Sequence, residues 1–155
     1  MNIRRMPVLL AAATAAVGVL TSTAAYATNW YTSSSPLIAY DDGVKQAGAY
    51  GSSYIENGTY ARTTSNQKDY RPGGDSVYVD TDYKYWMANS YGDMAWIEKA
   101  SKETGRTNSG SWVYKYTRHT LLGNPDRVRM VTHVCEDQSL SGDPCSANVI
   151  HTFSY

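Results

Sequence analysis

The sequence of 155 residues has little phenylalanine and cysteine, one and two residues respectively, and no long stretch of apolar residues at helical spacing. The missing helical pattern excludes a coiled coil, a helical bundle and a nucleotide-binding α/β enzyme. The 14 basic and 14 acidic side chains balance, and no basic run is present to bind nucleic acid or an anionic membrane. Tyrosine (14) and glycine (12) are abundant, which favours short strands joined by turns. The composition therefore predicts a small all-β protein, and it identifies no chemical reaction.

Residues 1–27 have the features of a secretory signal peptide. Two arginines near the start precede an apolar stretch of about 13 residues, and Ala25-Tyr26-Ala27 fits a cleavage site. A membrane anchor is the alternative, but a spanning helix needs about 20 apolar residues. We therefore expect a secreted, extracellular protein of one domain, residues 28–155.

The two cysteines, Cys135 and Cys145, bracket a polar and turn-forming stretch. In an oxidising space outside the cell, such a pair forms a structural disulfide. A metal site would require more ligands at thiolate spacing, and a redox pair usually has a Cys-x-x-Cys motif. We therefore predict a disulfide that closes a C-terminal hairpin, with no metal site and no cofactor.

Residues 28–42 differ from the rest, because two apolar or aromatic points are separated by the polar stretch Thr-Ser-Ser-Ser-Pro. One interpretation is an ordinary first strand that folds onto the body. The other is an extended N-terminal arm that docks into a partner through its aromatic and apolar side chains. The two points are the aromatic pair Trp30-Tyr31 and the stretch from Leu37 to Tyr40.

Residues 43–155 show short strands separated by turn signals, such as Asn57-Gly58. The clearest strand is 76–87, where apolar and polar side chains alternate with the period of a half-buried strand. The face of this strand that we predict to be buried carries Val77, Val79, Thr81, Tyr83, Tyr85 and Met87. The expected fold is a small antiparallel β-sandwich or barrel with an extended N-terminal arm and a disulfide-closed C-terminal hairpin.

The disulfide also suggests a register for the last two strands. If Cys135 faces Cys145, Val131 pairs with Val149, Met130 with Ile150 and Arg129 with His151. Val128, Met130, Val134 and Ile150 then form an inward face. The opposite face carries His133, His151 and Phe153.

Candidate catalytic, metal-binding and sugar-binding groups are few. His119, His133 and His151 are the possible bases of a hydrolytic triad, but none lies in a recognisable nucleophile motif. Asp80 and Asp82 share the polar face of the best strand, as in a calcium or glycosidase site, although such a face normally carries solvated charges. Trp86 and Tyr78 lie on that face and are the candidates for a carbohydrate platform. We predict that the protein is not an enzyme.

The stretches Ser-Pro-Leu-Ile-Ala-Tyr-Asp-Asp-Gly-Val-Lys-Gln-Ala and Arg-Pro-Gly-Gly-Asp-Ser-Val-Tyr-Val-Asp-Thr-Asp-Tyr carry a family resemblance. The chain from Trp30 to Tyr155 resembles the small exported adaptor subunits of Streptomyces-type actinobacterial umbrella toxin particles. The resemblance implies a β-rich, non-catalytic adaptor of an extracellular antibacterial complex. Its N-terminal arm would join a stalk protein with alanine-leucine-phenylalanine repeats to a lectin-bearing subunit. The resemblance implies that the partner-binding residues of the arm are Trp30, Tyr31, Leu37, Ile38 and Tyr40.

Two other functions remain open from the residues. One is a free-standing secreted carbohydrate-binding module, and the other is a lactococcin-like bacteriocin that acts alone on a cell envelope. The adaptor is the leading hypothesis, with protein subunits as partners and neither nucleic-acid binding nor membrane insertion. The corresponding division of the chain is a signal peptide (1–27), an arm (28–42) and a single β domain (43–155).

Overall fold

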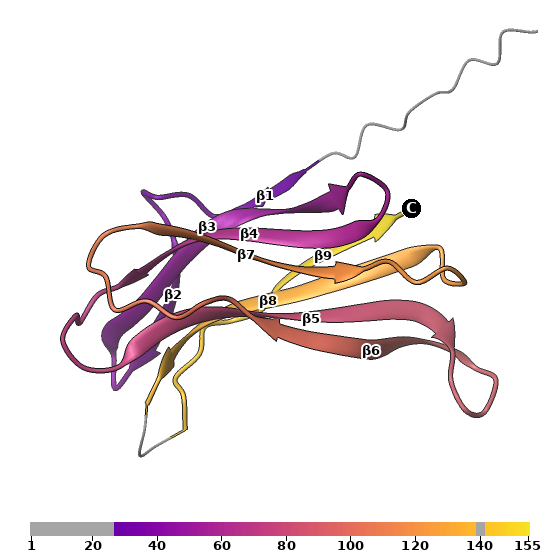
Figure 1. Ribbon diagram of the computed structural model, residues 1–155. Helices are drawn as coiled ribbons and strands as arrows, with labels where there is room; N and C mark the ends of the chain where they lie inside the picture. Colours follow the sequence, from indigo (N-terminus) through magenta and orange to yellow (C-terminus); the bar gives the residue numbers. More distant parts are fainter. Residues whose placement is uncertain (1–26, 139–141) are drawn as a thin grey trace, which may run out of the picture.

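The computed structural model describes residues 27–138 and 142–155, which form nine β-strands and no helix (Figure 1). The predicted signal peptide lies outside these residues except for Ala27. No helix in the described part of the chain is long and apolar enough to span a membrane. The strands are β1 (Thr28–Trp30), β2 (Leu37–Asp41), β3 (Val44–Glu56), β4 (Tyr60–Asp69), β5 (Ser76–Ala88), β6 (Met94–Glu103), β7 (Val113–Thr120), β8 (Arg127–Asp137) and β9 (Val149–Ser154).

The strands form two antiparallel sheets. In the five-stranded sheet, β1 and β2 both pair with β3, which is followed by β4 and then β7; the four-stranded sheet has the order β6-β5-β8-β9. The buried side chains of the two sheets meet, because Trp30 and Ala49 of the first sheet pack in one cluster with Val79 and Val134 of the second. The predicted all-β antiparallel fold is thus confirmed, and it is a two-layer sandwich.

The core is asymmetric across the two sheets. The four-stranded sheet contributes large side chains such as Tyr83, Tyr85 and Met130, all fully buried. The five-stranded sheet contributes mostly small ones, including Ala47, Ala49 and several serines and threonines. The aromatic residues of the five-stranded sheet therefore lie largely on its outer surface.

The β5 strand has the predicted alternation. Val77, Val79, Thr81, Tyr83 and Tyr85 are fully buried, and the intervening residues from Asp80 to Trp86 are partly exposed on the outer face. The buried tyrosines satisfy their hydroxyls across the sandwich: the Tyr83 hydroxyl is 2.9 Å from Thr117 Oγ1, and the Tyr85 hydroxyl is 2.9 Å from His119 Nδ1. Amphipathic tyrosines thus replace phenylalanine in this core.

The N-terminal segment is part of the sandwich, and this corrects the expectation of an extended arm. β1 pairs Trp30 with Gly51, and β2 pairs Leu37 with Ala49, so the segment supplies an edge to the first sheet. Trp30 and Leu37 are 3% and 4% exposed. Neither side chain is accessible to a partner while the segment remains paired with β3. Of the two interpretations of residues 28–42, the structure has the ordinary strand.

The disulfide between Cys135 and Cys145 is present, but the predicted register of the hairpin is wrong by one residue. Val131 pairs with Ile150, and Met130 pairs with His151. The cause is one extra residue in the segment after Cys145. Cys145 is one residue farther from Val149, where β9 begins, than Cys135 is from Thr132, the residue paired with Val149.

A one-residue slip moves every side chain of a strand to the other face of its sheet. Ile150, predicted to be buried, is 55% exposed, whereas Phe153 packs against the core. Val128, Met130 and Val134 are buried as predicted. Because β9 is displaced, His151 lies on the inner side, and the predicted shared face with His133 does not exist.

Candidate functional site

The most distinctive surface of the molecule is the outer side of the five-stranded sheet. We call it the aromatic face and define it by the outward aromatic side chains of β3, β4, β7 and their adjoining loops. These are Tyr50, Tyr54, Tyr60, Tyr70, Trp112, Tyr114 and Tyr116. Two of them, Tyr114 and Tyr116, are 56% and 48% exposed. The face arises because small residues fill the inward positions of the same strands.

Cationic side chains lie over these rings. The Arg62 guanidinium is 4.0 Å from the centre of the Tyr116 ring, and that of Arg118 is 4.4 Å from the Tyr60 ring. The Lys68 ammonium is 4.9 Å from the Tyr70 ring. Such cation–π contacts hold the long side chains flat on the sheet instead of extended into solvent.

One carboxylate, that of Glu56, lies among these cations. It forms a close ion pair with Arg62, and its second oxygen is 3.6 Å from Arg118. Arg62, Lys68 and Arg118 outnumber this single acid, so the aromatic face has an excess of positive charge. The surface therefore combines aromatic rings with fixed cations.

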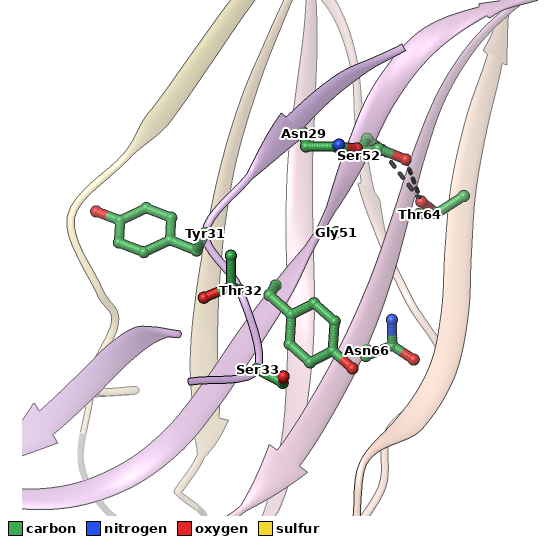
Figure 2. Close-up of a pocket in the computed structure, with 9 residues that line it drawn as sticks. Asn29, Tyr31, Thr32, Ser33, Gly51, Ser52, Thr64 and Asn66 are labelled. Atoms are coloured by element: carbon green, nitrogen blue, oxygen red, sulfur yellow. Dashed lines mark hydrogen bonds between the residues drawn. The ribbon is translucent and has the colours of Figure 1, made fainter. Parts of the chain in front are cut away.

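A hollow of about 420 Å³ lies at the β1 side of this face (Figure 2). It is lined by Asn29, Tyr31, Thr32, Ser33, Tyr50, Gly51, Ser52, Thr64 and Asn66, and we call it the Tyr31 hollow. Ser52 and Thr64 share a hydrogen bond of 2.9 Å between their hydroxyls. In Figure 2, Tyr31, Thr32 and Ser33 lie on the chain that leaves β1, and the remaining labelled residues lie on β1, β3 and β4.

The register of the sheet explains why this hollow exists. β1 ends opposite Gly51 and β2 begins opposite Ala49, so only Tyr50 of β3 lies between them without a partner on that edge. The six residues 31–36 must leave the sheet and return over this single position. Tyr31 starts the excursion with a φ of 55°, a left-handed conformation that bulky residues rarely adopt.

The excursion is closed by a tight turn. The backbone N–H of Thr32 donates to the Ser35 carbonyl at 3.2 Å, and the Ser35 N–H donates back to Thr32 at 3.1 Å. The Thr32 and Ser34 hydroxyls are 3.0 Å apart. These bonds make the outer part of residues 31–36 a defined wall of the Tyr31 hollow.

The outer side of the four-stranded sheet is arranged differently. Trp86 packs against Trp96 with ring centres 5.3 Å apart, and the guanidinium of Arg127 lies 5.2 Å from the Trp86 ring. Tyr78 is 7% exposed and donates a hydrogen bond of 2.6 Å to Asp143. The predicted carbohydrate platform of Trp86 and Tyr78 is therefore not formed as expected, because Tyr78 is buried and only Trp86, in contact with Trp96 and Arg127, remains partly exposed.

The three histidines lie in separate environments. His119 shares a hydrogen bond with the Tyr85 hydroxyl, and its ring stacks on the ring of Tyr83. Burial lowers the pKa of His119 below its usual value. His151 lies beside Phe153, and burial lowers its pKa as well. His133 has its Nε2 atom 3.8 Å from an oxygen of Asp80.

The group around Asp80 contains serine, histidine and carboxylate, but in an order that does not fit a hydrolytic triad. Ser101 donates to one Asp80 oxygen at 2.8 Å, and His133 faces the other. In a triad the histidine lies between the other two and removes the proton of the serine. Here the carboxylate lies between them. Asp82, the second candidate of this face, lies 3.5 Å from the Lys84 ammonium.

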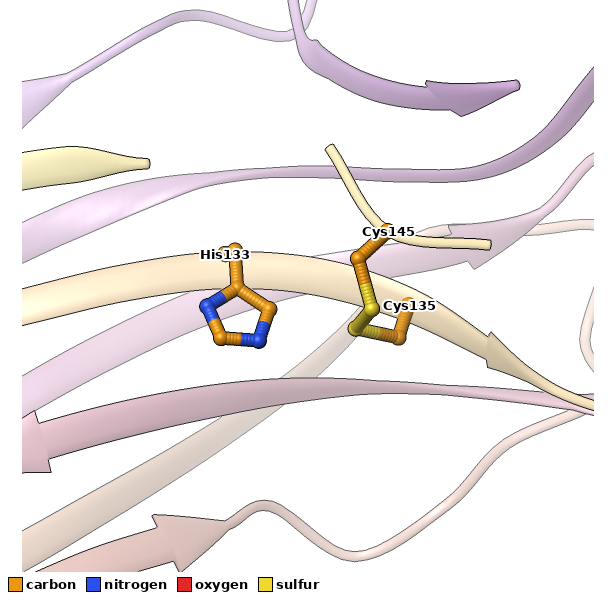
Figure 3. A group of neighbouring side chains, drawn as sticks. All are labelled: His133, Cys135 and Cys145. Carbon is orange, nitrogen blue, oxygen red and sulfur yellow. A yellow bond between two sulfur atoms is a disulfide. The ribbon is translucent and has the colours of Figure 1, made fainter. Parts of the chain in front are cut away.

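His133, Cys135 and Cys145 lie close enough to suggest a metal site (Figure 3), with their potential ligand atoms within 4.8 Å of one another. The two sulfur atoms are joined in the disulfide, so they are not thiolate ligands in this structure. The group therefore has the role predicted for the cysteines, a covalent closure of the segment that leads into β9.

The structure separates the predicted partner-binding residues into two groups. Trp30 and Leu37 are core residues, and Ile38 is half-buried on the outer side of the sheet near Gly48. Tyr31 and Tyr40 are 48% and 51% exposed. Sequence reasoning identified Tyr31, but it missed Tyr50, Ser52, Thr64 and Asn66, which complete the hollow. The alternation of residues 60–69 could have placed Thr64 and Asn66 on the outer face.

Comparisons with protein-family models, curated proteins and solved structures found no match to this chain.

Proposed function

We propose that this protein is a secreted, non-catalytic adaptor that binds other protein subunits of an extracellular antibacterial complex through its aromatic face. The observation that carries the proposal is the concentration of exposed and half-buried tyrosine beside stacked arginine on one sheet. Tyrosine, tryptophan and arginine are the residue types that most often dominate the energy of protein interfaces. A sheet face that displays them is suited to contact with another protein.

The fixed cations add a preference for the partner's charge. This face has more cationic than anionic side chains, because Arg62, Lys68 and Arg118 are balanced only by Glu56. An acidic patch on the partner would therefore complement its charge. Because the arginines already lie on tyrosine rings, little side-chain entropy would be lost on binding. The surface is in this sense preorganised.

The wider role comes from the resemblance of the sequence to umbrella toxin adaptors, in which the partners are a repeat-containing stalk protein and a lectin-bearing subunit. Our proposal assigns the partner contacts to the aromatic face instead of the N-terminal arm. In the resemblance the N-terminal arm carries the contacts, whereas in this chain Trp30 and Leu37 are buried. Tyr31 and Tyr40 remain available at the margin of the sheet.

The test is affinity capture of co-secreted proteins from the producer's culture supernatant by the tagged protein, read by mass spectrometry. We expect capture by the wild type and its loss in the double variant Tyr114→Ser/Tyr116→Ser. Ile150→Ser is the matched control, because Ile150 is equally exposed but lies on the opposite sheet. Equal capture by all three proteins would refute the aromatic face as the docking surface.

A second outcome separates the adaptor from a bacteriocin. If the wild type captures nothing and the purified protein alone inhibits growth of a sensitive bacterium, the adaptor proposal fails. The adaptor proposal expects no inhibition by the isolated chain, since its activity would require its partners.

A further inference from the structure

The Tyr31 hollow has a chemical character that the protein-docking role does not use. Its nine lining residues include no charged side chain. Two tyrosines supply aromatic surface, and asparagine, serine and threonine supply donors and acceptors. A lining of this kind offers nothing that would neutralise an anionic or cationic ligand, so it selects for a neutral and polar one.

The polar groups are also free to bind. Within residues 27–138 and 142–155, the side-chain amides of Asn29 and Asn66 have no hydrogen-bond partner. They come from two different strands, β1 and β4, and border the Ser52–Thr64 hydroxyl pair on β3 and β4. Each amide offers two donor hydrogens and a carbonyl acceptor. Together they can bind several hydroxyl groups of one ligand.

One aromatic ring of the lining is held in a fixed orientation. Tyr50 packs edge-on against Trp112, with ring centres 5.0 Å apart and an interplanar angle of 79°. Tyr50 is also the β3 residue left without an edge partner between β1 and β2. Its ring is therefore supported by Trp112 and lines the hollow beside residues 31–33.

From these features we propose that the Tyr31 hollow binds one neutral sugar ring of a glycan. A pyranose presents hydroxyl groups around its edge and an apolar C–H surface on its face, which matches amide groups beside a tyrosine ring. The volume of about 420 Å³ lies near the lower end for small-molecule sites, so it accommodates a single ring or a disaccharide end and leaves the remainder of the glycan in solvent. A charged saccharide is disfavoured because no counter-charge lines the hollow.

The backbone on two sides of the hollow is held by contacts within the protein. A methyl group at Gly51 would overlap the Thr64 carbonyl oxygen and lie 2.9 Å from Cζ2 of Trp30, so β3 fits tightly over the core at this point. The wall is held by the turn between Thr32 and Ser35. Contacts within the protein therefore define the backbone on these two sides of the hollow.

The experiment uses the purified protein on an array of neutral, sialylated and sulfated glycans, followed by NMR titration with the neutral glycan bound most strongly. We expect binding to neutral glycans, with amide shifts concentrated at Tyr50, Ser52 and Asn66. Asn66→Ala should weaken binding about tenfold at unchanged melting temperature. Asn124→Ala, in the exposed loop between β7 and β8, is the matched control and should bind as the wild type does.

Three results would overturn the proposal. They are binding to no neutral glycan, shifts confined to residues outside the hollow, and equal affinity of Asn66→Ala and the wild type. Each of these leaves the adaptor proposal standing, because protein capture depends on Tyr114 and Tyr116, which do not line the hollow.

Discussion

Replacing Trp30 by alanine is the sharpest perturbation of the N-terminal segment. Trp30 is 3% exposed and belongs to the core cluster that joins the two sheets. Removal of a buried tryptophan costs about 3–5 kcal/mol. The indole N–H of Trp30 is buried without a hydrogen-bond partner among the described residues, so its removal recovers part of that cost. We therefore expect a loss of about 3 kcal/mol in the free energy of unfolding.

For a domain of this size, the entropy of unfolding converts about 3 kcal/mol into a fall of about 10 °C in melting temperature. The assay is thermal unfolding followed by circular dichroism, with Trp30→Phe and Tyr31→Ala as matched variants. Trp30→Phe keeps most of the apolar volume and should lie close to the wild type. Tyr31→Ala removes a ring that is 48% exposed and should shift the melting temperature by no more than a few degrees.

The reasoning would be refuted if Trp30→Ala melted within about 3 °C of the wild type. That result would mean that residues 28–42 contribute little to the body, and the docking-arm interpretation would return. A large loss in Tyr31→Ala instead would show that the outer ring, and not the buried indole, anchors the segment.

Four further predictions concern the stability of the sandwich. Gly51→Ala should destabilise it by about 3 kcal/mol or more in urea titrations, because the new methyl group would meet the backbone of β4. Reduction of Cys135–Cys145 should cost about 2–3 kcal/mol, the value for a loop with a sequence separation of 10, and an unchanged urea midpoint after reduction would contradict this. Burial lowers the pKa of His151 below its usual value of 6.5, so the folded protein favours the neutral imidazole. The contribution of this residue to stability is therefore complete above pH 6.5 and is lost as the pH falls. Melting temperatures from pH 7 to 4 should decline less in His151→Phe than in the wild type. At the alkaline end, burial raises the pKa of Tyr83 to about 12, so stability should hold to about pH 10 and fall above it, less so in Tyr83→Phe.

Strand β5 could be predicted from the sequence because one of its faces is buried and the other is not. Val77, Val79 and Tyr83 alternate with Asp80, Asp82 and Lys84, and only one register of such a strand buries the apolar set. The disulfide was predictable for a similar reason, since two cysteines flank a turn-forming stretch.

The C-terminal hairpin was predicted one residue out of register because the sequence gives no sign of the extra residue after Cys145. The disulfide fixes one pair, but the ladder of β8 and β9 begins beyond it with a different offset. A single unpaired residue was enough to exchange the positions of Ile150 and Phe153.

The N-terminal segment was ambiguous for an energetic reason. β1 and β2 are short, and the polar stretch between them cannot be buried, so the same residues suit a strand or an arm. Whether they form a strand or an arm depends on the presence of a neighbouring strand to pair with. In this protein that strand is β3, whose residues from Val44 to Ser53 pair with β1 and β2. The Tyr31 hollow was not predictable, because it is the gap left where these two strands share one edge.

The most direct test of the aromatic face as the binding surface is site-specific photo-crosslinking. The photoreactive residue p-benzoylphenylalanine would replace Tyr116 in one protein and Ile150 in a second. Each protein would then be irradiated in the producer's culture supernatant. The two positions have similar exposure, 48% and 55%, and lie on opposite outer surfaces. We predict a crosslinked partner from position 116 and none from position 150. A crosslink from position 150 alone would contradict the proposed docking surface.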